Sequence, residues 1–194
     1  MDSIAPRIIL ASSSPRRKTL LEQLDLQFDV IVSDVEEYID PVIPPARLAE
    51  DLARHKAQAV ASSCANALVI GADTIVVDER GILGKPEDEA QAALMLRRLS
   101  GKAHRVITGL ALVSTSEPPS TLVRHEITQV KITVLSDRAI QRYVQSGEPL
   151  DKAGAYGIQG KGAKFVEWIH GCYNNVVGLP LFLFMQMLQE ISGQ

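Results

Sequence analysis

Residues 68–77 read LVIGADTIVV, the longest apolar run interrupted by a single carboxylate in the first half of the chain. A continuous apolar run of this length, followed by the turn residues 78–81, is typical of a strand buried in a sheet. One glycine, Gly71, and one carboxylate, Asp73, interrupt the run. We therefore expect a buried strand that carries a single acidic side chain.

The flanking sequence alternates between strand and helix patterns, with apolar residues at helical spacing in the helices. The expected strands are 7–11, 28–32, 105–114, 122–134 and 163–169, the fourth following the third as an antiparallel pair. The expected helices are about 46–62, 86–100, 137–146 and 179–191, with another that begins at Ser14-Pro15. This alternation predicts an α/β protein with a mixed twisted sheet flanked by helices.

Composition limits the classes of function. The 194 residues include 46% hydrophobic and 22% charged residues, which is ordinary for one globular domain or two joined lobes. We expect a single domain over 1–194, with two lobes and no clear linker. The net charge of −3 gives no general attraction to nucleic acid or anionic membrane, so neither is an expected partner.

Apolar runs and the spacing of cysteines and histidines bear on the location of the protein and on zinc binding. No apolar run approaches the roughly 20 residues of a membrane span, and no signal peptide is visible, so we expect a cytoplasmic protein. Cys64 and Cys172 are far apart and form no CxxC pair, which favours reduced thiols. The four histidines lack ligand spacing, so a zinc site is not supported.

The first candidate for chemistry is the stretch from Ser12 to Lys18, which joins a strand end to a helix start. Helix N-termini present free N–H groups and bind phosphate readily. Arg16 and Arg17 lie in the first turn, where the helix dipole disfavours cations unless an anion is nearby. The stretch is either a phosphate site or an ordinary capped helix with solvated basic residues.

The second candidate is Asp73 with Thr74. A carboxylate delivered into a cleft by a buried strand serves as a base or a metal ligand. The alternative is a capping or turn aspartate, but apolar residues continue through Val77, so no turn is evident.

Two lysines and an acidic cluster form weaker candidates. Lys56 lies at the edge of a helical apolar stripe, and Lys85 lies in a rigid Gly-Lys-Pro turn. Either lysine meets phosphate or extends into water. The cluster of Asp34, Glu36 and Glu37 suits Mg²⁺ or Mn²⁺, although a solvated acidic loop is the usual case.

The last candidate is the glycine-rich stretch 151–160, DKAGAYGIQG. Glycines permit close backbone approach to a ligand, and Gln159 offers the donor and acceptor that a pyrimidine edge requires. The stretch is neither a Walker loop nor a dinucleotide-binding fingerprint. A flexible surface loop is the alternative. Together, the candidates indicate a phosphate-ester enzyme or a nucleotide binder.

In addition, the motifs resemble those of the Maf family, in family order from about Ile8 to Leu181. The matching segments are Leu10–Arg17, Glu36-Glu37, Leu52–Ala57, Gly71–Thr74, Gly84–Pro86, Leu96–Gly101 and Asp151–Gly160.

The resemblance implies a nucleoside triphosphate pyrophosphatase that uses a divalent cation, Mg²⁺ or Mn²⁺, in the cytoplasm. It implies a fold like that of the inosine triphosphate pyrophosphatases, with two lobes, a deep cleft and often a homodimer. Asp73 is then the proton acceptor, and the metal is held by Glu37 and Asp73. The implied substrate-binding and specificity residues are Ser12, Arg16, Arg17, Lys56, Thr74, Lys85 and Gln159.

Within the resemblance, Gln159 indicates the branch that acts on dTTP and UTP, because the sister branch for 7-methyl-GTP lacks that glutamine. Three alternatives stay open: 7-methyl-GTP hydrolysis, a nucleotide-binding regulator of septum formation without turnover, and a nucleic-acid-binding protein. The net charge and the lack of a basic, aromatic-interleaved face disfavour the last.

Overall fold

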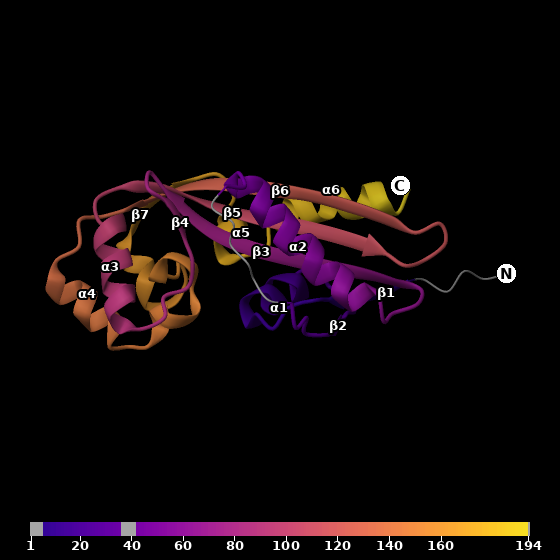
Figure 1. Cartoon of the computed structure of the whole chain (residues 1–194), viewed down its shortest axis with the longest axis horizontal. Helices are drawn as coiled ribbons and strands as arrows, with labels where there is room; N and C mark the ends of the chain where they lie inside the picture. Colours follow the sequence, from indigo (N-terminus) through magenta and orange to yellow (C-terminus); the bar gives the residue numbers. More distant parts are fainter. Residues whose placement is uncertain (1–5, 36–41, 194) are drawn as a thin grey trace. The chain divides into compact units, whose positions relative to one another are not determined.

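The strands form one mixed sheet. The computed structural model describes residues 6–35 and 42–193, and within them the sheet has seven strands in the order β2-β1-β3-β5-β6-β7, with β4 paired to β3 (Figure 1). The strands are β1 Arg7–Leu10, β2 Asp29–Val30, β3 Ala67–Asp78, β4 Gly81–Leu83, β5 Ala103–Ser114, β6 Ser120–Ile132 and β7 Val166–His170. The pairs β1–β2 and β1–β3 are parallel, whereas β3–β4 and β6–β7 are antiparallel.

Helices alternate with these strands along the chain. The α-helices are α1 Pro15–Glu22, α2 Pro45–Ala61, α3 Glu89–Leu99, α4 Asp137–Val144, α5 Tyr173–Val177 and α6 Leu181–Ile191. Three short 3₁₀ helices lie between α4 and β7: η1 Glu148–Asp151, η2 Ala153–Ala155 and η3 Gly160–Phe165. Side-chain caps start three of the helices, with Ser14, Asp88 and Ser136 each accepting a backbone N–H of the first turn.

The chain forms two compact units. Unit 1 comprises Met1–Asp73, Thr108–Glu126 and Gly178–Gln194, and unit 2 comprises Thr74–Ile107 and Ile127–Val177. The boundary crosses β3 between Asp73 and Thr74. The chain passes from one unit to the other several times, so neither unit is a continuous segment of the sequence.

Unit 1 is built on close contact between α2 and the sheet. The helix presents Ala49, Ala53 and Ala57, all with no exposed surface. A Cβ added to Gly71 of β3 would lie 2.2 Å from the carbonyl oxygen of Ala53, and one added to Gly109 of β5 would lie 2.0 Å from that of Ala49. The glycine inside the apolar run is therefore explained: it lets a helix backbone approach the strand.

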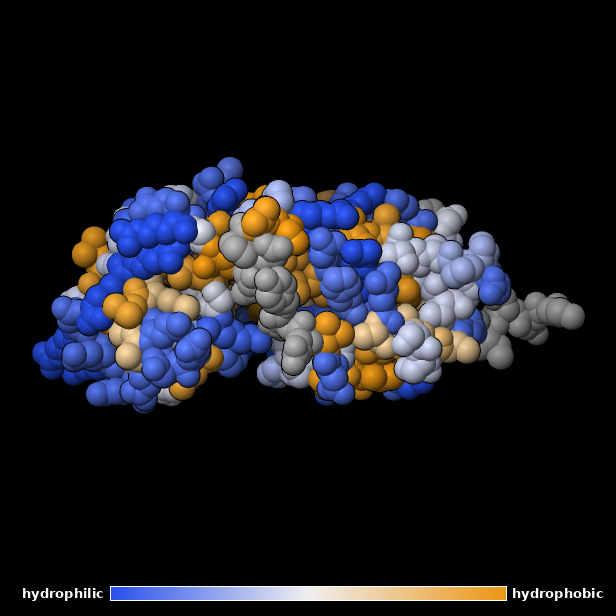
Figure 2. Space-filling view, in the orientation of Figure 1, coloured by the Kyte–Doolittle hydropathy of each residue, from blue (hydrophilic) through white to orange (hydrophobic). Residues whose placement is uncertain are grey.

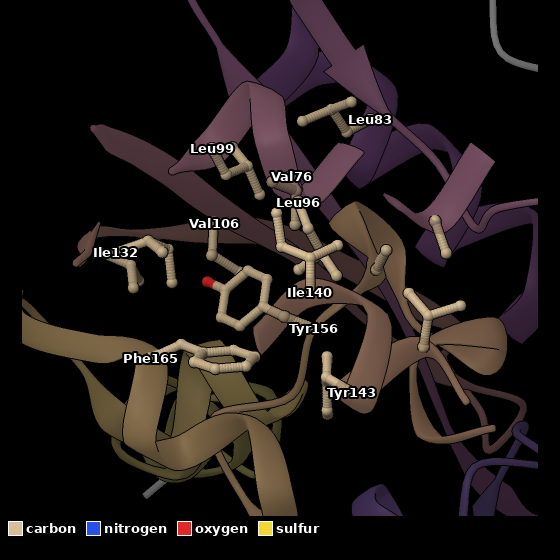
Figure 3. Packing of buried hydrophobic residues seen from close by; sticks show 14 residues of the cluster. Val76, Leu83, Leu96, Leu99, Val106, Ile132, Ile140, Tyr143, Tyr156 and Phe165 are labelled. Carbon is tan, nitrogen blue, oxygen red and sulfur yellow. The ribbon is translucent and has the colours of Figure 1, made fainter. Parts of the chain in front are cut away.

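Unit 2 has a core of larger side chains (Figure 3). Tyr143 and Phe165 meet edge to face with ring centroids 5.0 Å apart, and Tyr156 is buried among the aliphatic residues of the same cluster. Leu96 and Leu99 of α3 pack there with exposed fractions of 1% and 0%. Ala155 and Tyr156 of the glycine-rich stretch belong to this core.

Most expected elements are confirmed, and the differences have local causes. The helix expected at 46–62 is α2. The strand expected at 28–32 pairs only at Asp29–Val30, because its neighbour β1 is itself short. Residues 163–165 are not strand but the end of η3, and β7 begins at Val166. The strand β4 follows the expected turn 78–81 and is too short to give a periodic pattern. The pentapeptide 115–119 joins neighbouring β5 and β6, a connection too short for a parallel crossover.

The surface is mixed in polarity. The face in Figure 2 has hydrophilic and hydrophobic residues interspersed, with hydrophilic residues prevailing over α4 at the left edge. Large exposed side chains such as Leu94, Val134 and Phe182 come from separate elements. Such scatter is normal for globular proteins. Among residues 6–35 and 42–193, no helix has the length and apolar character needed to span a bilayer.

Candidate functional site

The start of α1 forms an ordered polar corner in unit 1. The Ser12 hydroxyl, in a residue that is 7% exposed, accepts the Ser14 amide at 3.2 Å and the Arg17 guanidinium at 3.3 Å. The Arg17 Nε also donates to the carbonyl oxygen of Gly178 at 2.8 Å. The guanidinium is thus held beside the helix start by the chain's own oxygen atoms.

A buried ion pair lies on the neighbouring strand. The Lys56 ammonium of α2 contacts Oδ1 of Asp73 in β3, and the two side chains are only 12% and 8% exposed. The close approach at Gly71 sets this contact, because Lys56 lies between the two alanines that touch the strand. Of the two alternatives for Lys56, extension into water is contradicted, because its ammonium contacts a carboxylate; the phosphate contact stays a prediction.

Strand register brings these two features to one edge of the sheet. Leu10 of β1 pairs with Ile70 of β3 in parallel, and the Ala11 amide continues the ladder by donating to the Ile70 carbonyl at 2.8 Å. Ser12 therefore lies two residues beyond the last β1–β3 pair along β1, and Asp73 lies three residues beyond it along β3, which continues to Asp78. The region beyond the carboxyl end of a parallel strand such as β1 is the usual ligand-binding edge of α/β sheets.

Unit 2 carries Thr74, Lys85 and Gln159. Thr74 continues β3 directly after Asp73 and is half-buried, whereas Lys85 and Gln159 are exposed. The amide of Gly154 donates to the carbonyl of Gly84 at 3.0 Å, which holds the glycine-rich stretch against the Gly-Lys-Pro turn. The turn that contains Lys85 and the stretch that contains Gln159 are far apart in the sequence, but they are neighbours within this unit.

The glycines of the glycine-rich stretch serve internal contacts. Gly154 has a φ of 69°, and a Cβ there would lie 3.0 Å from Val76. A Cβ on Gly157 would lie 2.8 Å from the Lys152 side chain. The sequence interpretation assigned these glycines to close approach of a ligand, but the close approach that the structure displays is to the chain's own side chains. Five of the ten residues of the stretch lie in 3₁₀ helices.

The predicted metal ligands are Glu37 and Asp73. Glu37 lies outside the described residues, as does Glu36. Across 6–35 and 42–193, no three His, Cys, Asp or Glu side chains gather as a metal-binding group. Of the two, only Asp73 is described, and its Oδ1 contacts the Lys56 ammonium. Mg²⁺ is commonly held by one or two carboxylates together with substrate phosphates, so a carboxylate here is a suitable ligand type. Arg16, in the first turn of α1, is half-buried.

A second polar feature, which the sequence did not indicate, lies in unit 2. His104 is 3% exposed, and its Nε2 lies 2.7 Å from the Tyr156 hydroxyl. Burial lowers the pKa of His104 to about 4, so the imidazole is neutral at pH 7. It borders a cavity of 240 Å³ that none of the predicted site residues lines; the lining residues are Val77, Asp78, Glu79, Ala103, His104, Arg105 and Gln129.

The sheet, the helix start and the ion pair define an α/β protein whose polar groups gather after the carboxyl end of β1 and on the neighbouring part of β3. Comparison with known proteins identifies the family within this class. The chain belongs to the Maf-like protein family, whose model matches residues 7–191. That match covers almost all of both units.

Relatives of this chain are similar over nearly their whole length. The chain is 50% identical over 186 residues to the dTTP/UTP pyrophosphatase of Ruminiclostridium cellulolyticum, covering 95% of this chain and 96% of that protein. It is 52% identical over 186 residues to the dTTP/UTP pyrophosphatase of Symbiobacterium thermophilum, covering 96% and 94%. Among solved structures it is similar to the Staphylococcus aureus Ham1 protein, with a TM-score of 0.45, 18% identity and coverage of 82% and 79%.

Proposed function

We propose that this chain hydrolyses dTTP and UTP to the nucleoside monophosphate and pyrophosphate. The observation that carries the proposal is the buried Lys56–Asp73 pair at the sheet edge where Ser12 and Arg17 also lie. A carboxylate beside fixed cations suits a reaction in which water is deprotonated while phosphate charge is neutralised. The choice of nucleotide is supported by relatives that are about half identical and carry that name.

In this mechanism the triphosphate binds to hydroxyl and cationic groups. Ser12 and Arg17 lie at the start of α1, where free N–H groups add to the positive field. Lys56 contributes its ammonium next to Asp73. Arg16 and Lys85 complete the proposed set of phosphate contacts. Two-pronged contacts from arginine are well suited to phosphate oxygens.

The chemical step is a hydrolysis of the α–β phosphoanhydride. Asp73 accepts a proton from a water molecule, and the water oxygen forms a bond to the α-phosphorus. The bond from that phosphorus to the bridging oxygen breaks, and pyrophosphate leaves with the electron pair. Arginine and lysine stabilise the negative charge that moves to the leaving group.

A divalent cation belongs to the proposal. The carboxylate of Asp73 would hold it together with Glu37 and the substrate phosphates, in keeping with the oxygen ligands that Mg²⁺ and Mn²⁺ prefer. When bound, such an ion neutralises phosphate oxygens and favours departure of pyrophosphate.

Thr74 and Gln159 are the proposed selectors of the base. The amide of Gln159 offers one donor group and one acceptor, which match the edge of a uracil or thymine ring. The remaining expectations stay part of the proposal: one functional domain over both units, a homodimer, a cytoplasmic location and a link to septum formation. They are supported by the family resemblance.

A nucleotide panel tests the proposal. Purified chain with Mg²⁺ or Mn²⁺ is expected to release both monophosphate and pyrophosphate from dTTP and UTP, and little from ATP or CTP. Nucleotide binding without any product would instead favour a regulator. Preference for 7-methyl-GTP would move the chain to the sister branch of the family.

The role of Asp73 is tested by Asp73→Asn. We expect turnover of UTP to fall by roughly 10²–10⁴-fold, the usual contribution of a general base, while nucleotide binding persists. The matched control is Asp29→Asn, which removes an exposed carboxylate that pairs with Arg7 in the same unit. Unchanged turnover in Asp73→Asn would remove this residue from the role of base.

A further inference from the structure

Gln159 is an exposed residue between two firmly held pieces of backbone. It precedes η3, and its neighbours Gly157 and Gly162 are half-buried and buried. The side chain of Glu148, in the first position of η1, accepts the Gly162 amide, and the Tyr143 hydroxyl accepts the Gly157 amide. An exposed tip on anchored flanks is a suitable support for a side chain that reads a ligand.

The Glu148 carboxylate binds the backbone after Gln159 directly, and it binds the backbone before Gln159 only through the Tyr143 hydroxyl. Its Oε2 accepts the Lys161 amide at 2.9 Å, and its Oε1 accepts the Gly162 amide at 3.1 Å. Oε1 also accepts the Tyr143 hydroxyl at 2.9 Å, and that hydroxyl in turn accepts the Gly157 amide at 3.1 Å. The backbone before and after Gln159 is therefore tied to one carboxylate.

Two glycines of this segment lie so close to the network that a Cβ on either would crowd it. Gly160 has a φ of 71°, and a Cβ there would lie 3.0 Å from Oε2 of Glu148. A Cβ on Gly162 would lie 2.7 Å from the Tyr143 hydroxyl oxygen. Larger residues at these two positions would push the carboxylate and the hydroxyl away from the amides, so the glycines leave the space that the network occupies.

The network needs an ionised acceptor. Burial raises the pKa of the Glu148 carboxyl, whereas the hydrogen bonds from the Lys161 amide, the Tyr143 hydroxyl and the Gly162 amide, together with the charge of Lys152, lower it. The net shift of the pKa is downward, so Glu148 is a carboxylate at neutral pH. A carboxylate has no hydrogen to donate, so both of its oxygens remain available to these three donors.

We propose that Glu148 is a positioning residue for base selection, because it binds the backbone after Gln159 directly and the backbone before Gln159 through the Tyr143 hydroxyl. The proposal rests on the proposed function, in which Gln159 meets the base. Glu148 touches no reacting group in this scheme. Its effect passes through Gln159 to the choice between nucleotides, and not to the chemical step at Asp73.

The test compares Glu148→Gln with Gln159→Ala and with the double variant. The amide in Glu148→Gln has one acceptor oxygen, so its NH₂ group must face one of the donors that the carboxylate satisfied. We expect kcat/KM for UTP to fall about tenfold, mainly through KM, and the preference for UTP over CTP to fall with it. In the Gln159→Ala background, the same change should leave that preference as it is.

Two further variants keep the test independent of folding. Glu167→Gln removes a carboxylate from an exposed position on β7 of the same unit. This variant should leave kcat/KM for UTP and for CTP unchanged. Gly160→Ala should lower the preference for UTP as Glu148→Gln does, because its Cβ crowds the same carboxylate. Hydrogen exchange of the Lys161 and Gly162 amides should accelerate in Glu148→Gln without any nucleotide present.

The outcomes separate the two proposals. Absence of turnover in the wild-type chain would reject the proposed function. Wild-type turnover, combined with an unchanged UTP preference in Glu148→Gln, would reject the positioning role. Equal losses for UTP and CTP, or an undiminished effect of Glu148→Gln in the Gln159→Ala background, would assign Glu148 to general stability and overturn the proposal.

Discussion

In unit 1, the candidate catalytic carboxylate is held by regular secondary structure, whereas in unit 2 the candidate base reader is held by hydrogen bonds. Asp73 lies in β3, and its partner Lys56 lies in α2, which touches the strand at Gly71 with no side chain between the backbones. Gln159 precedes η3, whose Lys161 and Gly162 amides are bound by Glu148. The same chain thus uses two different means of fixing a side chain.

The difference has consequences for what each site tolerates. Close backbone contact excludes any added volume, because packed interiors yield little to an extra methyl group. A carboxylate that binds amides tolerates changes at the surface but depends on its charge and its two acceptor atoms. We therefore expect the site in unit 1 to be most sensitive to size and the site in unit 2 to charge.

The largest expected effect on stability is that of Gly71→Ala. The added methyl group would overlap the Ala53 carbonyl oxygen at 2.2 Å and the Ala57 Cβ at 2.8 Å, so α2 must move away from β3. Overpacking of this kind costs about 3 kcal/mol, and the shift also separates Lys56 from Asp73. Chemical denaturation measures the free energy of unfolding. The rate of pyrophosphate release measures turnover, which should fall because Lys56 and Asp73 are separated.

The matched control is Gly147→Ala in unit 2. That glycine has a φ of 73°, and a Cβ added there would have no atom of the described residues within 4 Å, so only the left-handed backbone opposes alanine. We expect a cost of about 1 kcal/mol and no loss of turnover. Equal costs for the two variants would mean that close packing at Gly71 is not what holds the site in unit 1.

Sequence patterns predicted the elements that carry regular repeats, and with them part of the site. The apolar run indicated β3 and placed Asp73 on it, and the helical stripe put Lys56 at its edge. Glu148 carries no such signal, because its partners are backbone amides that follow it by 13 and 14 positions. His104 was also missed, because nothing in the sequence around four scattered histidines distinguishes a buried one.

Unit 2 should lose stability at low pH because it contains the buried His104. Burial lowers the pKa of this imidazole from 6.5 to about 4, so the unfolded chain binds its proton at a higher pH than the folded chain. The stability contribution is therefore complete above about pH 6.5 and is lost as the pH falls toward 4. Between about pH 7.5 and pH 5, this residue alone should lower the free energy of unfolding by about 2 kcal/mol.

His104→Gln isolates this effect. Glutamine does not titrate and retains a polar group for Tyr156, so the variant should lose less stability than the wild type over the same pH interval. His170→Gln, at an exposed position in the same unit, should reproduce the wild-type pH dependence. Urea denaturation at several pH values gives the slopes. Parallel slopes for wild type and His104→Gln would contradict a buried neutral imidazole.

The smallest expected effect comes from two helix caps, one in each unit. Ser14 accepts the Arg17 amide at 3.4 Å at the start of α1, and Ser136 accepts the Ala139 amide at 3.3 Å at the start of α4. Replacing either serine by alanine should lower the free energy of unfolding by about 1 kcal/mol. Because Arg17 belongs to the proposed phosphate site, only Ser14→Ala should raise the KM for UTP, by roughly threefold. Thermal unfolding together with steady-state kinetics separates the two quantities. A similar KM change in both variants would show that global stability, and not the geometry at the start of α1, controls nucleotide binding.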